Sequence, residues 1–329
     1  MRRFGGFLAI LIAVAVSGCG EGQSDEQISE TRLLLDTFCT ITIHGYGGPE
    51  LINEAFDLCE GYETLFSITM EGSDVWRINH ADGSPVEVAR ETVELIETGL
   101  DYGEISGGLF DITIGRVSRL WDFGGEPYIP SETELTDARV TVDYKKVRIV
   151  GDTVQLLDPD AWIDLGAIAK GYIADKIAAF LVENGVTGAV IDLGGDVVAV
   201  GSKSDGEPWR IGLRKPQGGT GDLLGVVETE EASIVSSGVY ERQFEKDGVL
   251  YHHILDPKTG RPAHSDVISA TVIAKNAAAG EGLSTIAILV GSERVQELFD
   301  LTPEFTGAAL VLENGDVLRF GDIDLKVIG

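Results

Sequence analysis

The pattern of apolar and polar positions predicts many short strands interrupted by a few helices. Alternating apolar and polar residues predict a half-buried strand over residues 33–44. Apolar residues at helical spacing predict helices over residues 49–66, 86–102, 169–184, 278–290 and 292–300. The remaining strands are expected within residues 140–157, 188–200, 209–213, 223–229, 233–235, 240–244 and 267–274, and in a hairpin over residues 305–320.

In this prediction strands outnumber helices and come in hairpin-like runs, not in regular strand–helix–strand units. The order predicts an α+β fold of antiparallel sheets and packed helices. A chain of 329 residues suits one large domain or two closely packed ones. Because no break in composition divides residues 31–329, we interpret them as a single unit.

Residues 1–18 are expected to be a targeting segment and not part of the fold. Two arginines precede an apolar run over residues 8–16, which is too short for a permanent membrane span. The run ends at Gly18-Cys19, in a setting that resembles a bacterial lipobox. We therefore expect cleavage before Cys19, lipidation of that residue, a polar tether up to residue 30, and anchoring on the extracytoplasmic side of a bacterial membrane. The alternative is an ordinary secretory signal that happens to contain a cysteine.

The charge of the chain narrows the ligands that it can bind. Asp and Glu number 54 against 25 Lys and Arg, so the net charge is -29. This balance argues against nucleic acid, whose binding needs a basic patch, and against general adhesion to an anionic membrane surface. An anionic ligand would need a local cation, either a basic side chain or a metal ion.

Two cysteines follow the targeting segment, Cys39 in a predicted strand and Cys59 in a predicted helix. Export would permit a disulfide between them. The alternative, which we favour, is a pair of small buried apolar residues. No zinc-type spacing of Cys and His occurs in the chain.

Residues 162–172 predict the end of a strand, a loop of small residues and the start of a helix. Backbone N–H groups at helix N-termini and in tight glycine loops bind phosphates. Asp164 ends the strand, and Lys170 places a positive charge in the first helical turn. These features favour an anion site over the alternative, a strand-to-helix turn with a solvated lysine.

Residues 278–287 carry a carboxylate and two hydroxyls within an apolar segment. If the segment is helical, Glu281, Ser284 and Thr285 lie at i, i+3 and i+4 on one face. Oxygen ligands of these kinds are those that Mg²⁺ prefers. The alternative is a helix with Glu281 as an exposed cap residue.

A glycine pair precedes Leu109, Phe110 and Asp111 within residues 107–115, and residues 120–124 follow with Leu-Trp-Asp-Phe-Gly. Glycines allow the backbone to pass close to a flat ligand. A turn capped by Asp111 is the reading that this segment favours when it is taken alone.

Two of the five histidines in the chain, His252 and His253, precede an Asp-Pro-Lys-Thr-Gly turn within residues 251–262. Consecutive strand residues point to opposite faces of a sheet. We therefore expect at most one of the two histidines to face a site.

Together the four segments resemble the ApbE family, the FAD:protein FMN transferases. The family's blocks have the forms GAFDITVGPL..LWGFG, IDLGGIAKGYAVD, NLGGD, HHIIDPRTG and ADALATAL. In the same order and with similar spacing, they correspond to residues 108–124, 163–175, 192–196, 252–260 and 280–287. Residues 73–79 also resemble the family's SELSRFN block. The resemblance covers about residues 31–320 and implies the family's mixed fold.

The resemblance also implies a set of site residues. The residues implied to line the flavin or contact FAD are Leu109, Phe110, Asp111, Asp164, Lys170 and Ile254. The groups implied to hold Mg²⁺ are the main-chain carbonyl of Ala167 and the side chains of Glu281, Ser284 and Thr285. His253 matches the family's histidine before Ile-[IL]-Asp-Pro, and it is our candidate for a catalytic acid/base or a phosphate-orienting group.

Three positions depart from the family pattern. The metal-binding helix usually begins with Asp where this chain has Glu281. A Met-Gly-Thr near the first strand is here Leu35-Asp36-Thr37, so Leu35 replaces a methionine that packs on FAD. An aromatic residue often found ahead of the SELSRFN-like block would fall near Thr69.

The implied activity is a Mg²⁺-dependent transfer of FMN from FAD to a threonine of an acceptor protein, with release of AMP. The resemblance implies acceptors that are exported or membrane flavoproteins of the electron-transfer subunit type. Two alternatives stay open, an FAD pyrophosphatase that yields FMN and AMP, and a lipoprotein that binds FAD without cleaving it. Retention of Glu281, Ser284 and Thr285 favours catalysis, because holding FAD alone needs no metal.

Overall fold

The computed structural model describes residues 27–45, 47–203, 205–219 and 221–328. The predicted targeting segment and Cys19 lie outside these residues. The first strand, β1 (Gln27–Leu34), begins inside the segment that we expected to be the tether, so residues 27–30 belong to the fold.

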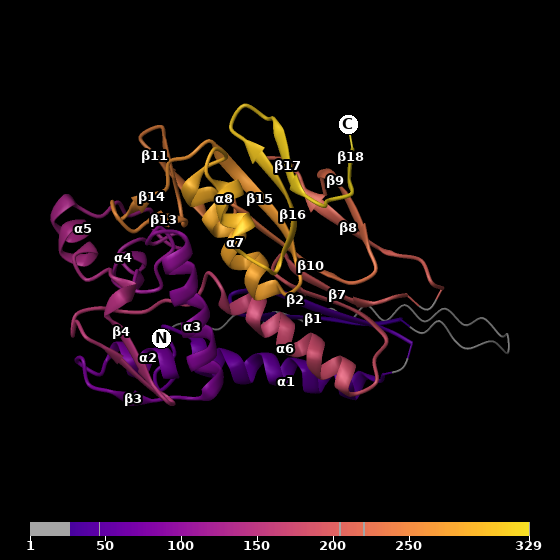
Figure 1. The fold of residues 1–329 in the computed structure, drawn as a ribbon, viewed down its shortest axis with the longest axis horizontal. Coiled ribbons are helices and arrows are strands. Elements are labelled where there is room, and N and C mark those ends of the chain that lie inside the picture. The colour runs from indigo at the N-terminus through magenta and orange to yellow at the C-terminus, as the bar shows by residue number, and fades with distance from the viewer. Residues whose placement is uncertain (1–26, 46, 204, 220, 329) are drawn as a thin grey trace, which may run out of the picture.

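A single antiparallel sheet of eight strands organises the chain and confirms the predicted α+β fold (Figure 1). Its order is β1-β2-β6-β7-β10-β15-β16-β17. The strands after β1 are β2 (Thr37–His44), β6 (Gly188–Leu193), β7 (Asp196–Gly201), β10 (Ala232–Gly238), β15 (Val267–Ala274), β16 (Phe305–Leu312) and β17 (Val317–Gly321). The predicted strand over residues 267–274 and the closing hairpin are confirmed.

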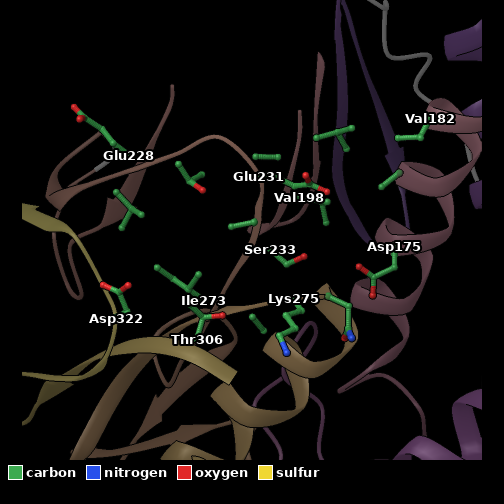
Figure 2. Close-up of a pocket in the computed structure, with 18 of the residues that line it drawn as sticks. Asp175, Val182, Val198, Glu228, Glu231, Ser233, Ile273, Lys275, Thr306 and Asp322 are labelled. Atoms are coloured by element: carbon green, nitrogen blue, oxygen red, sulfur yellow. The ribbon is translucent and has the colours of Figure 1, made fainter. Parts of the chain in front are cut away.

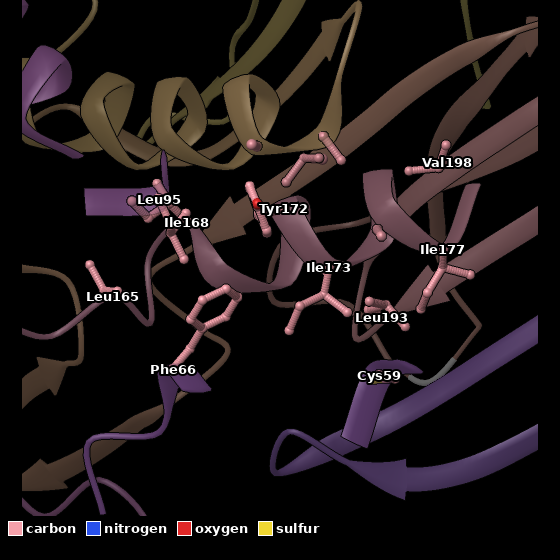
Figure 3. Packing of buried hydrophobic residues seen from close by; sticks show 14 of the residues in the cluster. Cys59, Phe66, Leu95, Leu165, Ile168, Tyr172, Ile173, Ile177, Leu193 and Val198 are labelled. Atoms are coloured by element: carbon pink, nitrogen blue, oxygen red, sulfur yellow. The ribbon is translucent and has the colours of Figure 1, made fainter. Parts of the chain in front are cut away.

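Helices α1 (Pro49–Phe66), α6 (Ala169–Glu183) and α7 (Ala277–Val290) pack on one face of this sheet (Figure 1). Ile173 and Ile177 of α6 point into the main core, toward Leu193 of β6 and Cys59 of α1 (Figure 3). The apolar spacing predicted α1 and α6 well, and Gly185 takes a positive φ of 86° just beyond α6.

The shorter elements surround this framework. The helices are α2 (Asp74–Asn79), α3 (Arg90–Ile105), α4 (Gly115–Ser118), α5 (Glu132–Arg139), η1 (Tyr144–Lys146) and α8 (Val295–Asp300). A sheet of order β18-β9-β8 (Leu325–Val327, Leu223–Thr229 and Trp209–Arg214) packs through Leu213 and Val227 against Ile234 and Ile273 of the main sheet. Another three-stranded sheet has the order β3-β5-β4 (Val86–Glu87, Thr153–Leu156 and Val147–Val150). Two further sheets have two strands each, β11 (Gln243–Lys246) with β12 (Val249–His252), and β13 (Leu255–Asp256) with β14 (Arg261–Pro262).

Within the described ranges, no helix has both the length and the apolar character needed to cross a membrane.

The single strand predicted over residues 33–44 is wrong, because the segment is a hairpin of β1 and β2. Leu35 and Asp36 form the turn with φ values of 53° and 57°. Two positive φ values are typical of tight hairpin turns, which usually carry Asn-Gly or Asp-Gly. Since neither turn residue is glycine, no turn signal is present, and the alternation of apolar and polar residues continues through the turn.

Three other boundaries differ from the prediction. The helix expected over residues 86–102 begins at Arg90, because residues 86–87 pair as strand β3. The last helix begins at Val295, and the strand expected over residues 240–244 begins at Gln243.

Asp175 of α6 fastens the start of α7, the helix that carries Glu281. Its two carboxylate oxygens accept hydrogen bonds from the backbone N–H groups of Ala277 (2.7 Å) and Ala278 (3.0 Å). Asn276 caps the same helix by accepting a hydrogen bond from the Ala279 N–H. Groups that would otherwise be unpaired at the helix end are therefore satisfied.

We expect Asp175→Ala to lower the free energy of unfolding by about 1–2 kcal/mol, the usual cost of losing a helix cap. Asp175→Asn keeps an acceptor oxygen and should cost less. Burial raises the pKa of Asp175 to about 6. Because the folded state then binds this proton more readily than the unfolded chain, the stability of the wild type relative to Asp175→Asn should rise as the pH falls from about 6 toward 4. Urea unfolding at several pH values measures both effects, and equal stability of all three proteins would contradict them.

Cys39 and Cys59 are adjacent, fully buried free thiols that join β2 to α1. The Cys39 side chain, together with burial, raises the pKa of the Cys59 thiol. This agrees with the interpretation of two small buried residues.

We expect a thiol reagent to leave Cys39 and Cys59 unmodified in the folded protein, because neither sulfur is exposed. A form lacking residues 1–19 should yield two reactive thiols after denaturation. Mass spectrometry of the labelled chain measures this count. Failure of either thiol to react in denaturant would instead reveal a disulfide.

Candidate functional site

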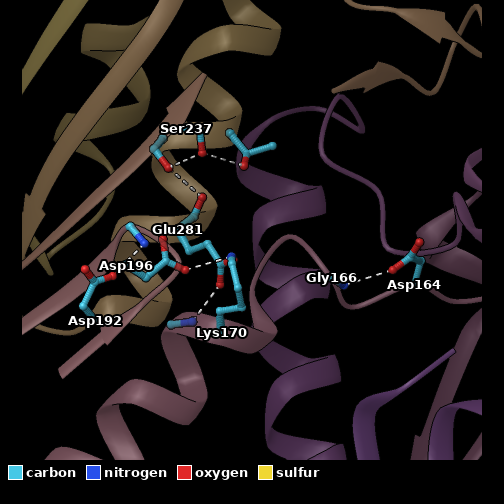
Figure 4. Close-up of polar contacts among 11 residues, drawn as sticks. Asp164, Gly166, Lys170, Asp192, Asp196, Ser237 and Glu281 are labelled. Atoms are coloured by element: carbon cyan, nitrogen blue, oxygen red, sulfur yellow. Dashed lines mark hydrogen bonds and ion pairs between the residues drawn. The ribbon is translucent and has the colours of Figure 1, made fainter. Parts of the chain in front are cut away.

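Four elements of the core bring polar side chains together at one end of α6. Lys170 lies in the first turn of α6, Glu281 in α7, Asp196 at the start of β7 and Ser237 in β10 (Figure 4). The absence of a side chain at Gly171 allows the two helices to approach, because a Cβ atom there would lie 2.3 Å from the Ala277 carbonyl oxygen.

Lys170 is shared by two buried carboxylates. Its Nζ atom lies 2.8 Å from Oδ2 of Asp196 and donates a hydrogen bond to Oε1 of Glu281. Burial alone would lower the pKa of Lys170, but the two carboxylates outweigh it and raise the pKa. The ammonium is therefore charged at neutral pH. The alternative of a turn with a solvated lysine is wrong, because Lys170 is paired with two buried carboxylates.

Glu281 is buried, and both of its carboxylate oxygens accept hydrogen bonds. Only 3% of the residue is exposed, and its Oε2 atom accepts a hydrogen bond from the Gly171 backbone N–H at 2.8 Å. The alternative of an exposed cap residue is therefore wrong, and the contact of Glu281 with Lys170 was not predicted from the sequence.

Asp196 is the least satisfied member of this cluster. It is 2% exposed, and its Oδ2 atom has no hydrogen-bond partner among the described residues, since Lys170 lies close to it but outside hydrogen-bond geometry. Burial raises the pKa of Asp196 well above its usual value, against the effect of Lys170. The cation that faces this buried oxygen is the Lys170 ammonium, 2.8 Å away.

Hydroxyl groups of β10 and α7 lie together beside the main chain of Glu281, as Figure 4 shows. Ser284 Oγ lies 2.7 Å from Ser237 Oγ and 3.0 Å from the Glu281 carbonyl oxygen, to which it donates. Thr285 Oγ1 lies 3.4 Å from Ser237 Oγ. The predicted set of Glu281, Ser284 and Thr285 is thus brought together on one stretch of α7.

The side chains of Glu281, Ser284 and Thr285 fit a hard cation such as Mg²⁺, because all three offer oxygen atoms. Ala167 lies in the loop just before α6. In the part of the chain that the structure describes, no three His, Cys, Asp or Glu side chains form a ready metal-binding group. Hydroxyl and carbonyl oxygens would therefore have to complete the ligand set.

Asp164 organises the loop before α6 and lies apart from the cluster (Figure 4). Its Oδ1 atom accepts the Gly166 N–H at 3.0 Å, and its Oδ2 atom accepts the Ser118 hydroxyl at 2.7 Å. The predicted loop and helix start are confirmed, but the predicted strand before them is wrong, because Trp162 forms only an isolated bridge with Ile114. Asp164 does not touch Lys170.

Asp111 acts as the cap of a turn, which was the reading that this segment alone favoured. It is buried, and its carboxylate accepts hydrogen bonds from Thr113 N–H, the Thr113 hydroxyl and Tyr144 N–H. Phe110 is 4% exposed and packs edge-to-face on Tyr102 in the main core, whereas Leu109 is half-buried.

The two histidines differ in burial and in one contact. His252 is buried and its Nε2 atom is hydrogen-bonded to the Ala263 carbonyl oxygen at 3.1 Å, whereas His253 is half-buried. The Nδ1 atoms of both histidines have no hydrogen-bond partner within the described residues. Burial, and then the charge of Arg242, lower the pKa of His253 to about 4. Ile254 is 5% exposed and packs in an apolar cluster with buried residues of β15, α7 and β16.

Leu35 sits in the strained β1–β2 turn and packs against the main core. The turn between β6 and β7 lies beside this hairpin, since Gly194 N–H donates to the Phe38 carbonyl oxygen. Leu35 is thus near the strand end that carries Asp196.

Asp196 and Ser237 were not predicted as site residues from the sequence. Asp196 closes a block that the family resemblance had marked, but nothing in the sequence showed that a residue 26 positions beyond Lys170 would contact it. Ser237 gave no signal, since a serine in a predicted strand is ordinary.

A cavity of about 840 Å³ lies elsewhere, beside the C-terminal half of α6 (Figure 2). Asp175, Val198, Ser233 and Ile273 are among the residues that line it. None of the predicted site residues does, so this cavity is distinct from the Lys170 cluster.

Comparison with known proteins gives a consistent result. The sequence model of the ApbE family matches residues 35–308. An FAD:protein FMN transferase of Treponema pallidum is 34% identical over 306 residues, which cover 87% of this chain and 84% of that protein. An FAD:protein FMN transferase of Klebsiella pneumoniae is 34% identical over 284 residues, with 83% and 88% covered.

Solved structures agree with this assignment of the fold. The crystal structure of the ApbE protein from Thermotoga maritima superposes with a TM-score of 0.82 at 32% identity, covering 89% of this chain and 97% of that one. The flavin transferase ApbE from Vibrio cholerae gives a TM-score of 0.80 at 27% identity, with 90% and 96% covered.

Proposed function

The chain belongs to the ApbE family and is a flavin transferase, and from this we propose that it is a Mg²⁺-dependent FAD:protein FMN transferase. The observation that carries the proposal is the contact between Lys170 of α6 and Glu281 of α7, with Ser284 and Thr285 beside it. A cation and a set of oxygen ligands for Mg²⁺ meet at one point, which is what a pyrophosphate needs in a protein of net charge -29.

The proposed reaction exchanges one phosphorus–oxygen bond for another. The hydroxyl oxygen of an acceptor threonine forms a bond to the phosphorus atom of the FMN half of FAD. The bond from that phosphorus to the bridging oxygen breaks, and AMP leaves with the bridging oxygen. The proton of the threonine hydroxyl passes to a base in the site.

Lys170 would bind the pyrophosphate, because its ammonium stays charged between two carboxylates. Glu281, Ser284, Thr285 and the Ala167 carbonyl would hold Mg²⁺. When bound, the ion neutralises charge on the pyrophosphate and on the departing phosphate.

His253 is our candidate for the base. With its pKa lowered to about 4, the imidazole is neutral at physiological pH and able to accept a proton. The other proposed FAD contacts are Leu35, Leu109, Phe110, Asp111, Asp164 and Ile254. Of these, Phe110, Asp111 and Ile254 are buried, so they would contribute mainly by shaping the walls of the site.

The experiment incubates a form lacking residues 1–19 with FAD and Mg²⁺, with and without a flavoprotein acceptor of the electron-transfer subunit type. AMP release and flavin fluorescence on a denaturing gel are followed. Acceptor-dependent covalent fluorescence that EDTA abolishes supports the transferase. FMN and AMP without labelling favour the pyrophosphatase, and bound but intact FAD favours a binding protein.

We further propose that Cys19 is lipidated and anchors the protein on the extracytoplasmic side of a bacterial membrane. The sequence before this residue is the support for the proposal. We expect the full-length chain to sediment with membranes and incorporate labelled palmitate, whereas Cys19→Ser should do neither. Equal palmitate labelling of both chains would exclude this anchor.

A further inference from the structure

We propose that Asp196 is the positioning residue that holds the Lys170 ammonium in place for the pyrophosphate. The inference rests on the proposed function, in which Lys170 binds the substrate. It gives a role to a buried carboxylate that the chemistry of Glu281, Ser284 and Thr285 leaves unexplained.

Two carboxylates hold Lys170, but only Asp196 is committed to it. Glu281 also accepts the Gly171 N–H and would be a ligand of Mg²⁺. A cation that draws the Glu281 carboxylate weakens its bond to Lys170. Asp196 Oδ2, 2.8 Å from Nζ, has no hydrogen-bond donor to compete for it among the described side chains and backbone groups.

The backbone around Asp196 is built to fix its position. It follows the Gly194-Gly195 turn, where φ is 69° and 100°, values that glycine adopts without strain. Asp192 Oδ1 accepts the Gly195 N–H at 2.8 Å, and Asp196 itself pairs with both Leu193 and Val235 in the sheet. The carboxylate therefore projects from a rigid strand toward the more flexible lysine side chain.

The balance of charge in the cluster favours a functional reading of Asp196 over a stabilising one. Two buried carboxylates, those of Asp196 and Glu281, face one ammonium and repel each other. An asparagine of the same shape would remove that repulsion. A residue kept only for stability would not be expected to carry this charge.

The test compares the full-length wild type with Asp196→Asn, Lys170→Ala and the double variant. We expect Asp196→Asn to slow AMP release about 10- to 100-fold, as loss of a residue that orients a site group does. In the Lys170→Ala background the same change should have less than about a twofold effect, because Asp196 acts through Lys170. Labelled FAD at excess enzyme keeps the slow variants measurable.

Two measurements without turnover complete the design. The melting temperature of Asp196→Asn should equal or exceed that of the wild type, and its affinity for Mn²⁺ in the absence of FAD should change less than about threefold. Asp158→Asn is the matched control, since Asp158 pairs with Lys146 and neither residue belongs to the Lys170 cluster. It should keep the wild-type rate of AMP release.

Independent, multiplicative losses in the double variant would overturn the proposal, as would a wild-type rate in Asp196→Asn. A tenfold loss of Mn²⁺ affinity would make Asp196 a metal ligand instead. If the wild type itself releases no AMP and labels no acceptor, the proposed function fails first, and the variants are not needed to show it.

Discussion

Glu281→Ala is expected to reduce flavin transfer about 10³-fold, the largest effect of any single change in the Lys170 cluster. The variant loses a proposed Mg²⁺ ligand, and charge on the departing phosphate would then be poorly neutralised. It also loses one of the two partners of Lys170. Single-turnover transfer to an acceptor protein, measured over a range of Mg²⁺ concentrations, gives both the rate and the metal requirement.

Glu281→Asp is the informative companion, because the family usually has aspartate there. It should retain most of the activity, with a changed Mg²⁺ requirement, since the shorter side chain must reach the same ion. Glu297→Ala removes an exposed carboxylate of α8 and should have no effect. A Glu281→Ala variant that transfers FMN at the rate of Glu297→Ala would remove Glu281 from the metal site.

Stability should separate the two functions of Glu281. Lys170 keeps Asp196 as a partner in Glu281→Ala, so the buried ammonium is not left unpaired. We therefore expect a loss in unfolding free energy of less than about 2 kcal/mol, below the 3–5 kcal/mol typical when a buried charge loses its only partner. Urea unfolding without added metal measures this difference.

The sequence predicted those parts of the fold whose signal is local. α6 and α7 have long apolar periodicity and clear ends, and β15 is rich in apolar and β-branched residues, so their bounds were predicted within a residue or two. The prediction missed the β1–β2 hairpin, because Leu35 and Asp36 adopt positive φ values that are uncommon for their residue types.

The sequence predicted those groupings of site residues that lie on a single helix, but not the contacts between different elements. Glu281, Ser284 and Thr285 share a helix, so spacing alone grouped them. The contact of Lys170 with Asp196 depends on how α6 crosses the end of β7, which no local pattern encodes. Likewise, one hydrogen bond that Asp111 accepts comes from the backbone N–H of Tyr144, more than thirty positions away, and no local pattern encodes it.

His253→Asn is expected to slow FMN transfer about 10²- to 10⁴-fold, the range typical of losing a general acid or base. The imidazole pKa of about 4 means that the neutral, proton-accepting form predominates above pH 5. The rate should therefore show no inflection near 6.5 from this group, and should fall only as the pH approaches 4. The pH dependence of single-turnover transfer in wild type and variant measures this.

His252→Asn is the matched control, because His252 is the adjacent imidazole but is bonded to the Ala263 carbonyl inside the protein. It should lower stability while leaving the chemical step nearly unchanged.

For His253 the linkage has a definite sign: the unfolded chain takes up this proton near pH 6.5 and the folded protein only near 4. Wild-type stability should consequently fall as the pH drops through this window, and His253→Asn should lose that part of the pH dependence. A rate inflection near 6.5 that His253→Asn abolishes would mean instead that the histidine is solvated when FAD binds, and the neutral-base role would have to be abandoned.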